Sequence, residues 1–157
     1  YGRPDATDAE VEAAAKMGMT IAVGCPLGYQ PDRGIVDRAR EEARQTGAVI
    51  EIGADPFVAV KDADVVYTDV WISMGQEREQ AKRLKILAPY QLNARLLKCA
   101  KPDALVMHCL PAHRGEEISA EVLDGPQSVV FDQAENRLHM QKAILVRLLG
   151  KKPVRST

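Results

Sequence analysis

Three short segments carry residue types that can do chemistry, and each directly follows a predicted strand. They cover residues 68–76, 108–114 and 132–137. In open α/β sheets, ligands bind beyond the carboxyl ends of the strands, so the position of these segments predicts a site for a small ligand. Asp69, in the first segment, is an anion that only accepts hydrogen bonds, which suits an ammonium group.

Motifs for several other chemistries are absent from the sequence. It has no GxGxxG or GxxxxGK[ST] phosphate loop and no HExxH, and its three cysteines form no CxxC pair. We therefore expect no metal site and reduced thiols. His108 and Cys109 are neighbours, so on a strand they would face opposite sides, which argues against a Cys–His catalytic dyad.

Apolar runs alternate with helical patterns from one end of the chain to the other. The apolar runs predict strands at residues 20–24, 48–52, 63–68, 104–108 and 128–131. Helical patterns cover residues 6–19, 32–46, 77–87, 93–100, 119–122 and 134–149, and a short helix opens at Asp55. Asp32 and Asn93 are predicted N-caps, and Gly47 a predicted helix end.

This alternation predicts βαβ units, and hence a three-layer, Rossmann-like α/β fold with a parallel sheet and helices on both faces. Such a unit normally opens with a strand, whereas this chain opens with a helix. We therefore expect the sheet to lack its opening strand, or that strand to lie outside this chain. One domain is predicted over residues 1–150, followed by a basic tail at 151–157.

Composition excludes several classes of partner. The 157 residues include 21 Lys and Arg against 22 Asp and Glu, and this balance argues against nucleic acid or an anionic membrane. No apolar run approaches the roughly 18 residues that span a bilayer. Residues 1–5 lack the apolar core of a signal peptide, so we expect a cytoplasmic protein.

Three strings stand in the order and approximate spacing of one protein family. They are Asp-Val-Trp-Ile-Ser-Met-Gly at 69–75, His-Cys-Leu-Pro at 108–111 and Glu-Asn-Arg at 135–137. Together they resemble the ornithine carbamoyltransferases, and the similarity to the second, ornithine-binding domain of that family runs over about residues 13–149. The Ser-Met-Gly loop favours ornithine over putrescine, and aspartate carbamoyltransferases lack the cysteine at this place.

The resemblance implies transfer of a carbamoyl group from carbamoyl phosphate to the δ-amine of L-ornithine, which gives citrulline and phosphate in arginine metabolism. The amine attacks the carbonyl carbon, a tetrahedral intermediate forms and phosphate leaves, without a cofactor. By the same resemblance, Asp69 would bind an ammonium group of ornithine. Ser73 and Met74 match the loop that holds the amino-acid end of ornithine, and Gly75 would let that loop turn.

The two later strings imply further roles. Cys109 would lie near the reacting amine and position it, without a covalent intermediate. Leu110 would contribute its carbonyl, next to a Leu110–Pro111 peptide bond that is cis in the family. Arg137 would contact the carbamoyl oxygen, where negative charge develops during attack. Three further residues would support these groups: His108, Gln133 and Asn136.

Two departures from the family pattern limit what this chain is expected to do alone. The Ser-x-Arg-Thr-Arg and His-Pro-x-Gln motifs of the carbamoyl-phosphate domain do not occur in these residues, and neither does the Asn pair that follows the opening strand. We therefore expect the chain to need that other domain and to be inactive by itself. Family members are trimers whose contacts lie largely in the other domain, so we expect a monomer or a dimer here.

Two alternatives stay open at the level of the sequence. The chain could be a non-catalytic α/β binding or assembly module derived from a carbamoyltransferase, which ornithine binding would test. It could also serve a carbamoyltransferase with another amine acceptor. Competition between ornithine, putrescine and N-acetylornithine would distinguish that alternative from an ornithine carbamoyltransferase.

Overall fold

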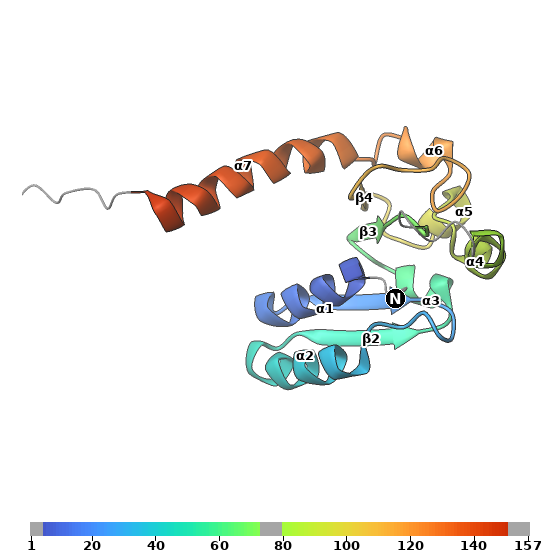
Figure 1. Cartoon of the computed structure of the whole chain (residues 1–157). Coiled ribbons are helices and arrows are strands. Elements are labelled where there is room, and N and C mark those ends of the chain that lie inside the picture. The colour runs from blue at the N-terminus through green and yellow to red at the C-terminus, as the bar shows by residue number, and fades with distance from the viewer. Residues whose placement is uncertain (1–4, 73–79, 151–157) are drawn as a thin grey trace, which may run out of the picture.

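The computed structural model describes residues 5–72 and 80–150, and its helices and strands alternate along the chain (Figure 1). In chain order they are α1 (Asp5–Met17), β1 (Thr20–Gly24), α2 (Arg33–Thr46), β2 (Val49–Gly53), α3 (Pro56–Val60), β3 (Val65–Thr68), α4 (Gln80–Leu87), η2 (Ala88–Tyr90), α5 (Ala94–Leu97), β4 (Leu105–His108), α6 (Ala120–Leu123) and α7 (Val130–Leu149). The predicted α/β class is confirmed.

The strands form two separate parallel pairs. β1 pairs with β2, from Thr20 opposite Val49 onward, and β3 pairs with β4, from Val65 opposite Leu105 onward. One parallel bridge adds Ser128 beside β4. Doubly wound sheets place their first strand between the second and the fourth, and the break between β1 and β3 falls at that position. The expected lack of an opening strand is confirmed for the residues that the structure describes.

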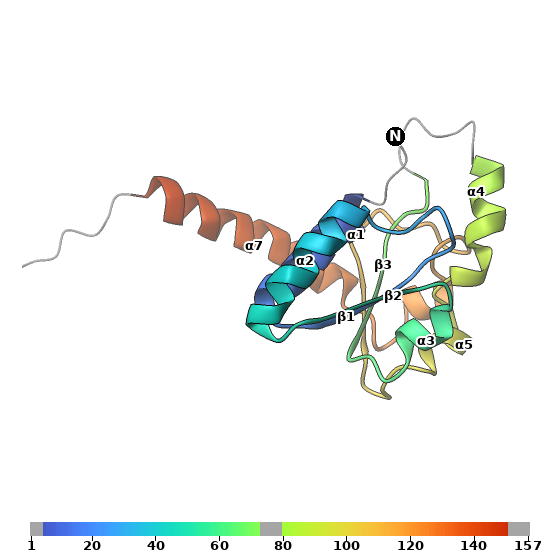
Figure 2. The same cartoon turned by 90° about the horizontal axis from the view of Figure 1, so that it is seen from below.

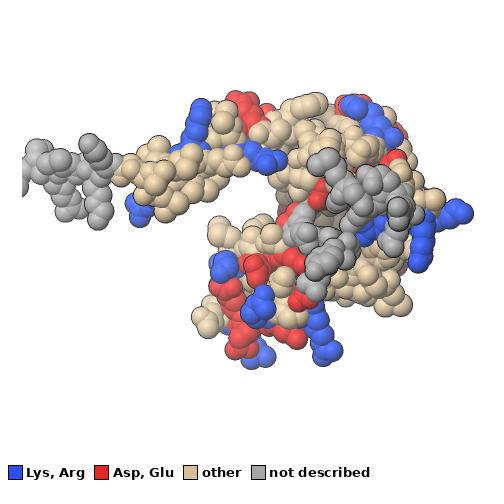
Figure 3. Space-filling view, viewed as in Figure 1, with Lys and Arg blue, Asp and Glu red and all other residues tan. Residues whose placement is uncertain are grey.

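Helices cover both faces of β1 and β2. α1 and α2 lie side by side on one face, and α3 lies on the other (Figure 2). A small core joins α1, α2 and β2; its buried members are Val11, Ala15, Ala39, Ala43 and Ile50. Acidic and basic side chains intermix over this part of the surface (Figure 3), and the pairs Lys16–Glu42 and Arg38–Glu12 join the two helices.

The predicted N-caps of α2 and α5 and the predicted end of α2 are confirmed, because each has a residue with a strong capping preference. The Asp32 carboxylate accepts from the backbone N–H groups of Gly34 and Ile35 at 3.0 and 3.3 Å, which starts α2. Gly47 ends the same helix with φ 80°, a left-handed conformation that favours glycine. Asn93 caps α5 through a bond from the Leu96 N–H at 3.1 Å.

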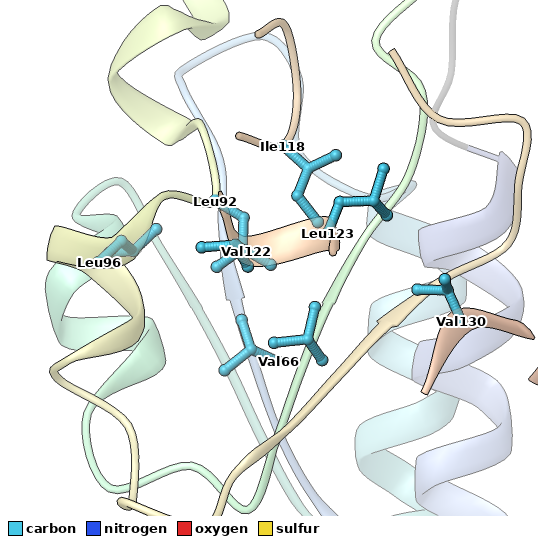
Figure 4. Close-up of a cluster of buried hydrophobic side chains, with 8 residues drawn as sticks. Val66, Leu92, Leu96, Ile118, Val122, Leu123 and Val130 are labelled. Carbon is cyan, nitrogen blue, oxygen red and sulfur yellow. The ribbon is translucent and has the colours of Figure 1, made fainter. Parts of the chain in front are cut away.

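A second apolar core surrounds β3 and β4 (Figure 4). Its buried members come from both strands and from the segments between them and after them: Val66, Leu92, Leu96, Val106, Ile118, Val122, Leu123 and Val130. The Leu92 N–H donates to the Glu117 carbonyl at 2.9 Å, which ties the segment before α5 to the loop after β4. This core therefore fixes the loop that follows β4.

The last part of the chain differs from its prediction. Residues 128–131 were expected to form a strand and 134–149 a helix, whereas only Ser128 makes a bridge and α7 already begins at Val130. Val130 is buried and Phe131 is exposed, so the apolar run has one inward side chain rather than a strand face. Short apolar runs fit either element, and packing decides between them.

Beyond its first turn, α7 stands away from the rest of the molecule (Figures 1 and 2). Most of its large apolar side chains are exposed: Phe131, Leu138, Met140, Ile144, Leu145, Val146, Leu148 and Leu149. Among the described helices, none is both long and apolar enough to cross a membrane. Residues 151–157 lie outside the described part, so the predicted domain end and basic tail stay predictions.

Candidate active site

The candidate site lies where β3 and β4 end side by side. Asp69 directly follows β3 and Cys109 directly follows β4, and the strands pair in register up to Thr68 opposite His108. The Cys109 thiol donates to the Asp69 carboxylate, with Sγ 2.6 Å from Oδ1. The structure thus joins two predicted site residues that are 40 positions apart in the sequence.

The surroundings of Cys109 keep its thiol protonated. Burial is the main cause, because it disfavours the charged thiolate, and the hydrogen bond to Asp69 adds to it. Together they raise the pKa of Cys109 to about 11. A thiol with this pKa is a hydrogen-bond donor at neutral pH and a poor nucleophile. The geometry therefore supports a positioning role rather than covalent chemistry.

Two residues that the sequence analysis missed complete this cluster. The side chain of Tyr67 hydrogen-bonds with Cys109 and with Glu10 of α1. Burial raises the pKa of Glu10 to about 7; the charge of Asp69 adds to this rise and the bond to Tyr67 opposes it. Burial, together with the charge of Glu10, raises the pKa of Tyr67 far above its usual range. At neutral pH the cluster therefore keeps two of its protons, on Tyr67 and Cys109.

A buried network around His108 and Glu117 contacts the turn that follows Cys109. His108 accepts the Leu110 N–H at Nδ1 (2.8 Å), so its Nε2 carries the proton and donates to Glu117 Oε1 at 3.2 Å. Burial alone would raise the pKa of Glu117, but the bonds from His108 and from the His113 N–H outweigh it and lower that pKa. His108 thus contacts the backbone of Leu110, and its supporting role in the site stays a prediction.

The network surrounds the predicted cis peptide bond. Leu110–Pro111 is cis, and Leu110 itself has φ 55°. Leu110 directly follows Cys109 in the chain. The part of Leu110 in binding a ligand stays a prediction.

Arg137 lies on α7, whose first turn is joined to β4. The Gln133 side-chain oxygen accepts from the His108 N–H at 2.9 Å. Arg137 follows one helical turn later on the same face and is exposed. Among the described residues, no hydrogen bond or ion pair joins it to Asp69 or Cys109. Its predicted contact with the carbamoyl oxygen therefore stays a prediction.

Two predicted ligand-binding residues, Ser73 and Met74, lie outside the described residues. A cavity of about 850 Å³ reaches Asp69 and also includes Glu10, Tyr67 and Trp71 in its walls. Ligand pockets commonly have volumes of roughly 300–1,000 Å³, so this cavity can hold a small molecule beside the Asp69 carboxylate.

One group of side chains could offer ligand atoms to a metal ion. In the described part of the chain, His113, Glu116 and Glu117 bring such atoms within 4.8 Å of one another. Glu117 Oε1 already accepts hydrogen bonds from His108 and from the His113 backbone.

The sequence signals of the missed residues differ. Tyr67 and Asp69 are two positions apart at the end of one strand, so strand alternation could have placed them on one side. Glu10 gave no signal, because an acidic residue on a helix normally faces water. Glu117 gave none either, because nothing in its sequence neighbourhood indicates that a buried histidine lies beside it.

Comparisons with known proteins identify the family of the chain. Residues 6–148 match the model of the family described as aspartate/ornithine carbamoyltransferase, Asp/Orn binding domain. The ornithine carbamoyltransferase of Syntrophus aciditrophicus is 59% identical over 139 residues, which are 88% of this chain and 45% of that relative. The one from Geobacillus stearothermophilus is 58% identical over 137 residues, 87% of this chain and 44% of the relative.

Solved structures show the same correspondence. The ornithine carbamoyltransferase of Pyrococcus furiosus superposes with a TM-score of 0.87 at 52% identity, covering 92% of this chain and 46% of that one. This chain therefore spans less than half the length of the relatives it matches. A family match over almost its whole length shows that the chain belongs to the aspartate/ornithine carbamoyltransferase family, as an Asp/Orn binding domain.

Proposed function

We propose that this chain supplies the ornithine-binding half of an ornithine carbamoyltransferase. That enzyme transfers the carbamoyl group of carbamoyl phosphate to the δ-amine of L-ornithine. The observation that carries the proposal is the Asp69–Cys109 pair at the carboxyl ends of β3 and β4, in a chain that belongs to this family. Carbamoyl phosphate is bound by the part of the longer enzyme that this chain does not include.

In this proposal, Asp69 holds an ammonium group of ornithine. Its carboxylate only accepts hydrogen bonds and faces a cavity large enough for an amino acid. Cys109 and Tyr67 remain protonated beside it, so their contribution is to orient the carboxylate and the amine. Attack by the amine pushes negative charge onto the carbamoyl oxygen, where the fixed positive charge of Arg137 stabilises the transition state.

The sequence identities to named relatives favour ornithine over other amine acceptors. A solved N-acetyl-L-ornithine transcarbamylase superposes with a TM-score of 0.79, but at 29% identity. Relatives named ornithine carbamoyltransferase reach 54 to 59%. The Asp69–Cys109 pair also disfavours a purely structural module, because a buried fold position does not require a thiol hydrogen-bonded to a carboxylate.

Titration calorimetry with ornithine, putrescine and N-acetylornithine tests the proposal. We expect ornithine to bind the chain most tightly, and Asp69→Asn to weaken it about 10- to 100-fold by removing a charge-assisted bond. The matched control is Asp64→Asn, at the exposed start of the same strand, where Asp64 pairs with Lys101. The chain with carbamoyl phosphate and ornithine should give no citrulline. Equal ornithine affinity in both variants, or tighter binding of another amine, would contradict the proposal.

A further inference from the structure

The buried carboxylate of Glu117 has one oxygen without a hydrogen bond. Its Oε1 accepts from His108 and from the His113 N–H, whereas its Oε2 is buried and has no hydrogen-bond partner among the described residues. The side chain of Glu117 is 0% exposed, so bulk water does not reach this oxygen. Burying an acceptor without a partner destabilises a fold, so a cation bound at Oε2 would stabilise this one.

The imidazole ring of His113 lies beside this oxygen. Its Nδ1 is 3.7 Å from Glu117 Oε2, which is too far for a hydrogen bond. Two ligand atoms of a tetrahedral zinc ion are about 3.3 Å apart, because each lies roughly 2.0–2.1 Å from the metal. The separation of Nδ1 and Oε2 is therefore close to the one that a shared zinc ion requires.

Glu116 can supply a third ligand atom. One side-chain atom from each of His113, Glu116 and Glu117 lies within 4.8 Å of the other two. Glu116 is only partly buried, so rotation of its side chain can bring its carboxylate to the same ion. Burial alone would raise the pKa of Glu117, but the bonds from His108 and the His113 N–H lower it, so Glu117 is a carboxylate at neutral pH. This group of side chains therefore offers one nitrogen and two oxygen ligands.

The backbone that carries these side chains is held by hydrogen bonds of its own. The Glu116 N–H donates to the His113 carbonyl at 3.0 Å, and the Gly115 N–H donates to the Ile118 carbonyl at 2.8 Å. The Gln91 side chain donates to the carbonyls of Gly115 and Glu116, both at 2.9 Å. These bonds fix the ligands relative to one another before an ion binds. The side chain of His113 is 50% exposed, which leaves the ion a path from solvent.

We propose that His113, Glu116 and Glu117 form a binding site for one zinc ion, with water as the fourth ligand. The imidazole nitrogen favours zinc over magnesium and calcium, and three protein ligands are too few for the oxygen-rich shell of calcium. The spacing His-x-x-Glu-Glu differs from the HExxH and CxxC motifs whose absence predicted no metal site. The proposal does not depend on the reaction proposed at Asp69 and Cys109.

Titration of the tag-free chain with zinc chloride, followed by NMR of the histidine side chains, tests the site. The chain has three histidines, so the three imidazole signals can be assigned and followed separately. We expect zinc to shift the ring signals of His113 and to leave those of His139, which pairs with Glu135 on α7, unchanged. Magnesium chloride at the same concentration should shift neither. No shift at His113, or equal zinc affinity at His139, would overturn the proposal.

Variants identify the ligands by titration calorimetry with zinc chloride. His113→Asn and Glu116→Gln should each weaken zinc binding by at least about tenfold, the lower end of the loss seen when only a supporting contact of a metal ligand is removed. Both side chains are at least partly exposed, so both variants should fold. His139→Asn is the matched control and Cys109→Ser tests the thiol as a ligand; both should bind zinc as the unaltered chain does. Unchanged affinity in His113→Asn, or a loss in Cys109→Ser as large as that in His113→Asn, would overturn the proposal.

Discussion

At the scale of single residues, the site is a cluster of side chains whose pKa values are raised by burial. Cys109, Tyr67 and Glu10 each have a raised pKa, and Asp69 supplies the negative charge among them. Asp69 and Cys109 could be predicted from the sequence, because both follow strands whose ends meet. Glu10 could not, because it comes from a helix whose approach to β3 depends on the packing of the whole α1–β1 unit.

The rate at which the Cys109 thiol is alkylated should depend on its hydrogen bond to Asp69. Asp69→Asn removes the negative charge beside the thiol, so the pKa of Cys109 should fall and its thiolate fraction should rise. We expect alkylation of Cys109 by iodoacetamide at pH 8 to become several-fold faster, as followed by peptide mass spectrometry. Cys25 and Cys99 are internal controls whose rates should stay constant. Unchanged alkylation of Cys109 would mean that Asp69 does not control its proton.

Glu10 should make stability depend on pH. Its pKa is about 7 in the folded protein, above the model value of 4.5, so the folded state binds the proton more tightly. The stabilisation is complete below pH 4.5 and is lost as pH rises toward 7 and beyond. Solvent screening of this partly exposed group limits the loss to about 1–2 kcal/mol.

Glu10→Gln should remove this part of the pH dependence. Urea unfolding at pH 5 and pH 8 gives the free energy of unfolding, and the difference between the two pH values should shrink in the variant. Glu12→Gln, two positions along the same helix, controls for a general change in charge. A variant whose pH dependence matched that of the unaltered chain would show that Glu10 titrates normally.

At the scale of elements, capping residues determine some helix ends, and tertiary packing determines others. The ends of α2 follow from Asp32 and Gly47, whose preferences are strong enough to be read from the sequence. The start of α7 does not, because Val129 and Val130 fit a strand as well as a helix. The burial of Val130 in the second core favours the helix, and this contact could not be predicted from the sequence.

The loop after β4 should depend on Glu117. Glu117→Gln removes a charge that accepts bonds from His108 and from the His113 N–H. Because these groups are buried, we expect the free energy of unfolding to fall by about 1–3 kcal/mol. Glu116→Gln, the adjacent and less buried position, should change it by less than about 0.5 kcal/mol. Equal effects of the two substitutions would refute a special role for the buried network.

At the scale of the whole molecule, the fold consists of two cores on either side of the break between β1 and β3. The core around α1 and α2 and the core around β4 share none of their buried members. The layering and the lack of an opening strand could be predicted from the order of elements. The width of the break could not, since the sequence does not say whether β1 and β3 close on each other.

Two separate cores should give two unfolding events. Val11→Ala removes methyl groups only from the first core, and Val106→Ala only from the second. We expect amide exchange to show that each substitution destabilises its own half by about 1–3 kcal/mol and leaves the other nearly unchanged. If either substitution accelerated exchange equally in both halves, the molecule would unfold as one unit.

The arrangement of α7 has a mechanical consequence. With 20 residues it is about 30 Å long, and only its first turn is held, by Val130 in the second core and by Gln133 on the His108 N–H. The space-filling view shows open space between this helix and the α1–α2 layer (Figure 3). A protein or domain that binds the far end of α7 would therefore exert torque on its first turn. Through the bond from the His108 N–H to Gln133, that torque would reach His108 and the Leu110 turn beside Cys109.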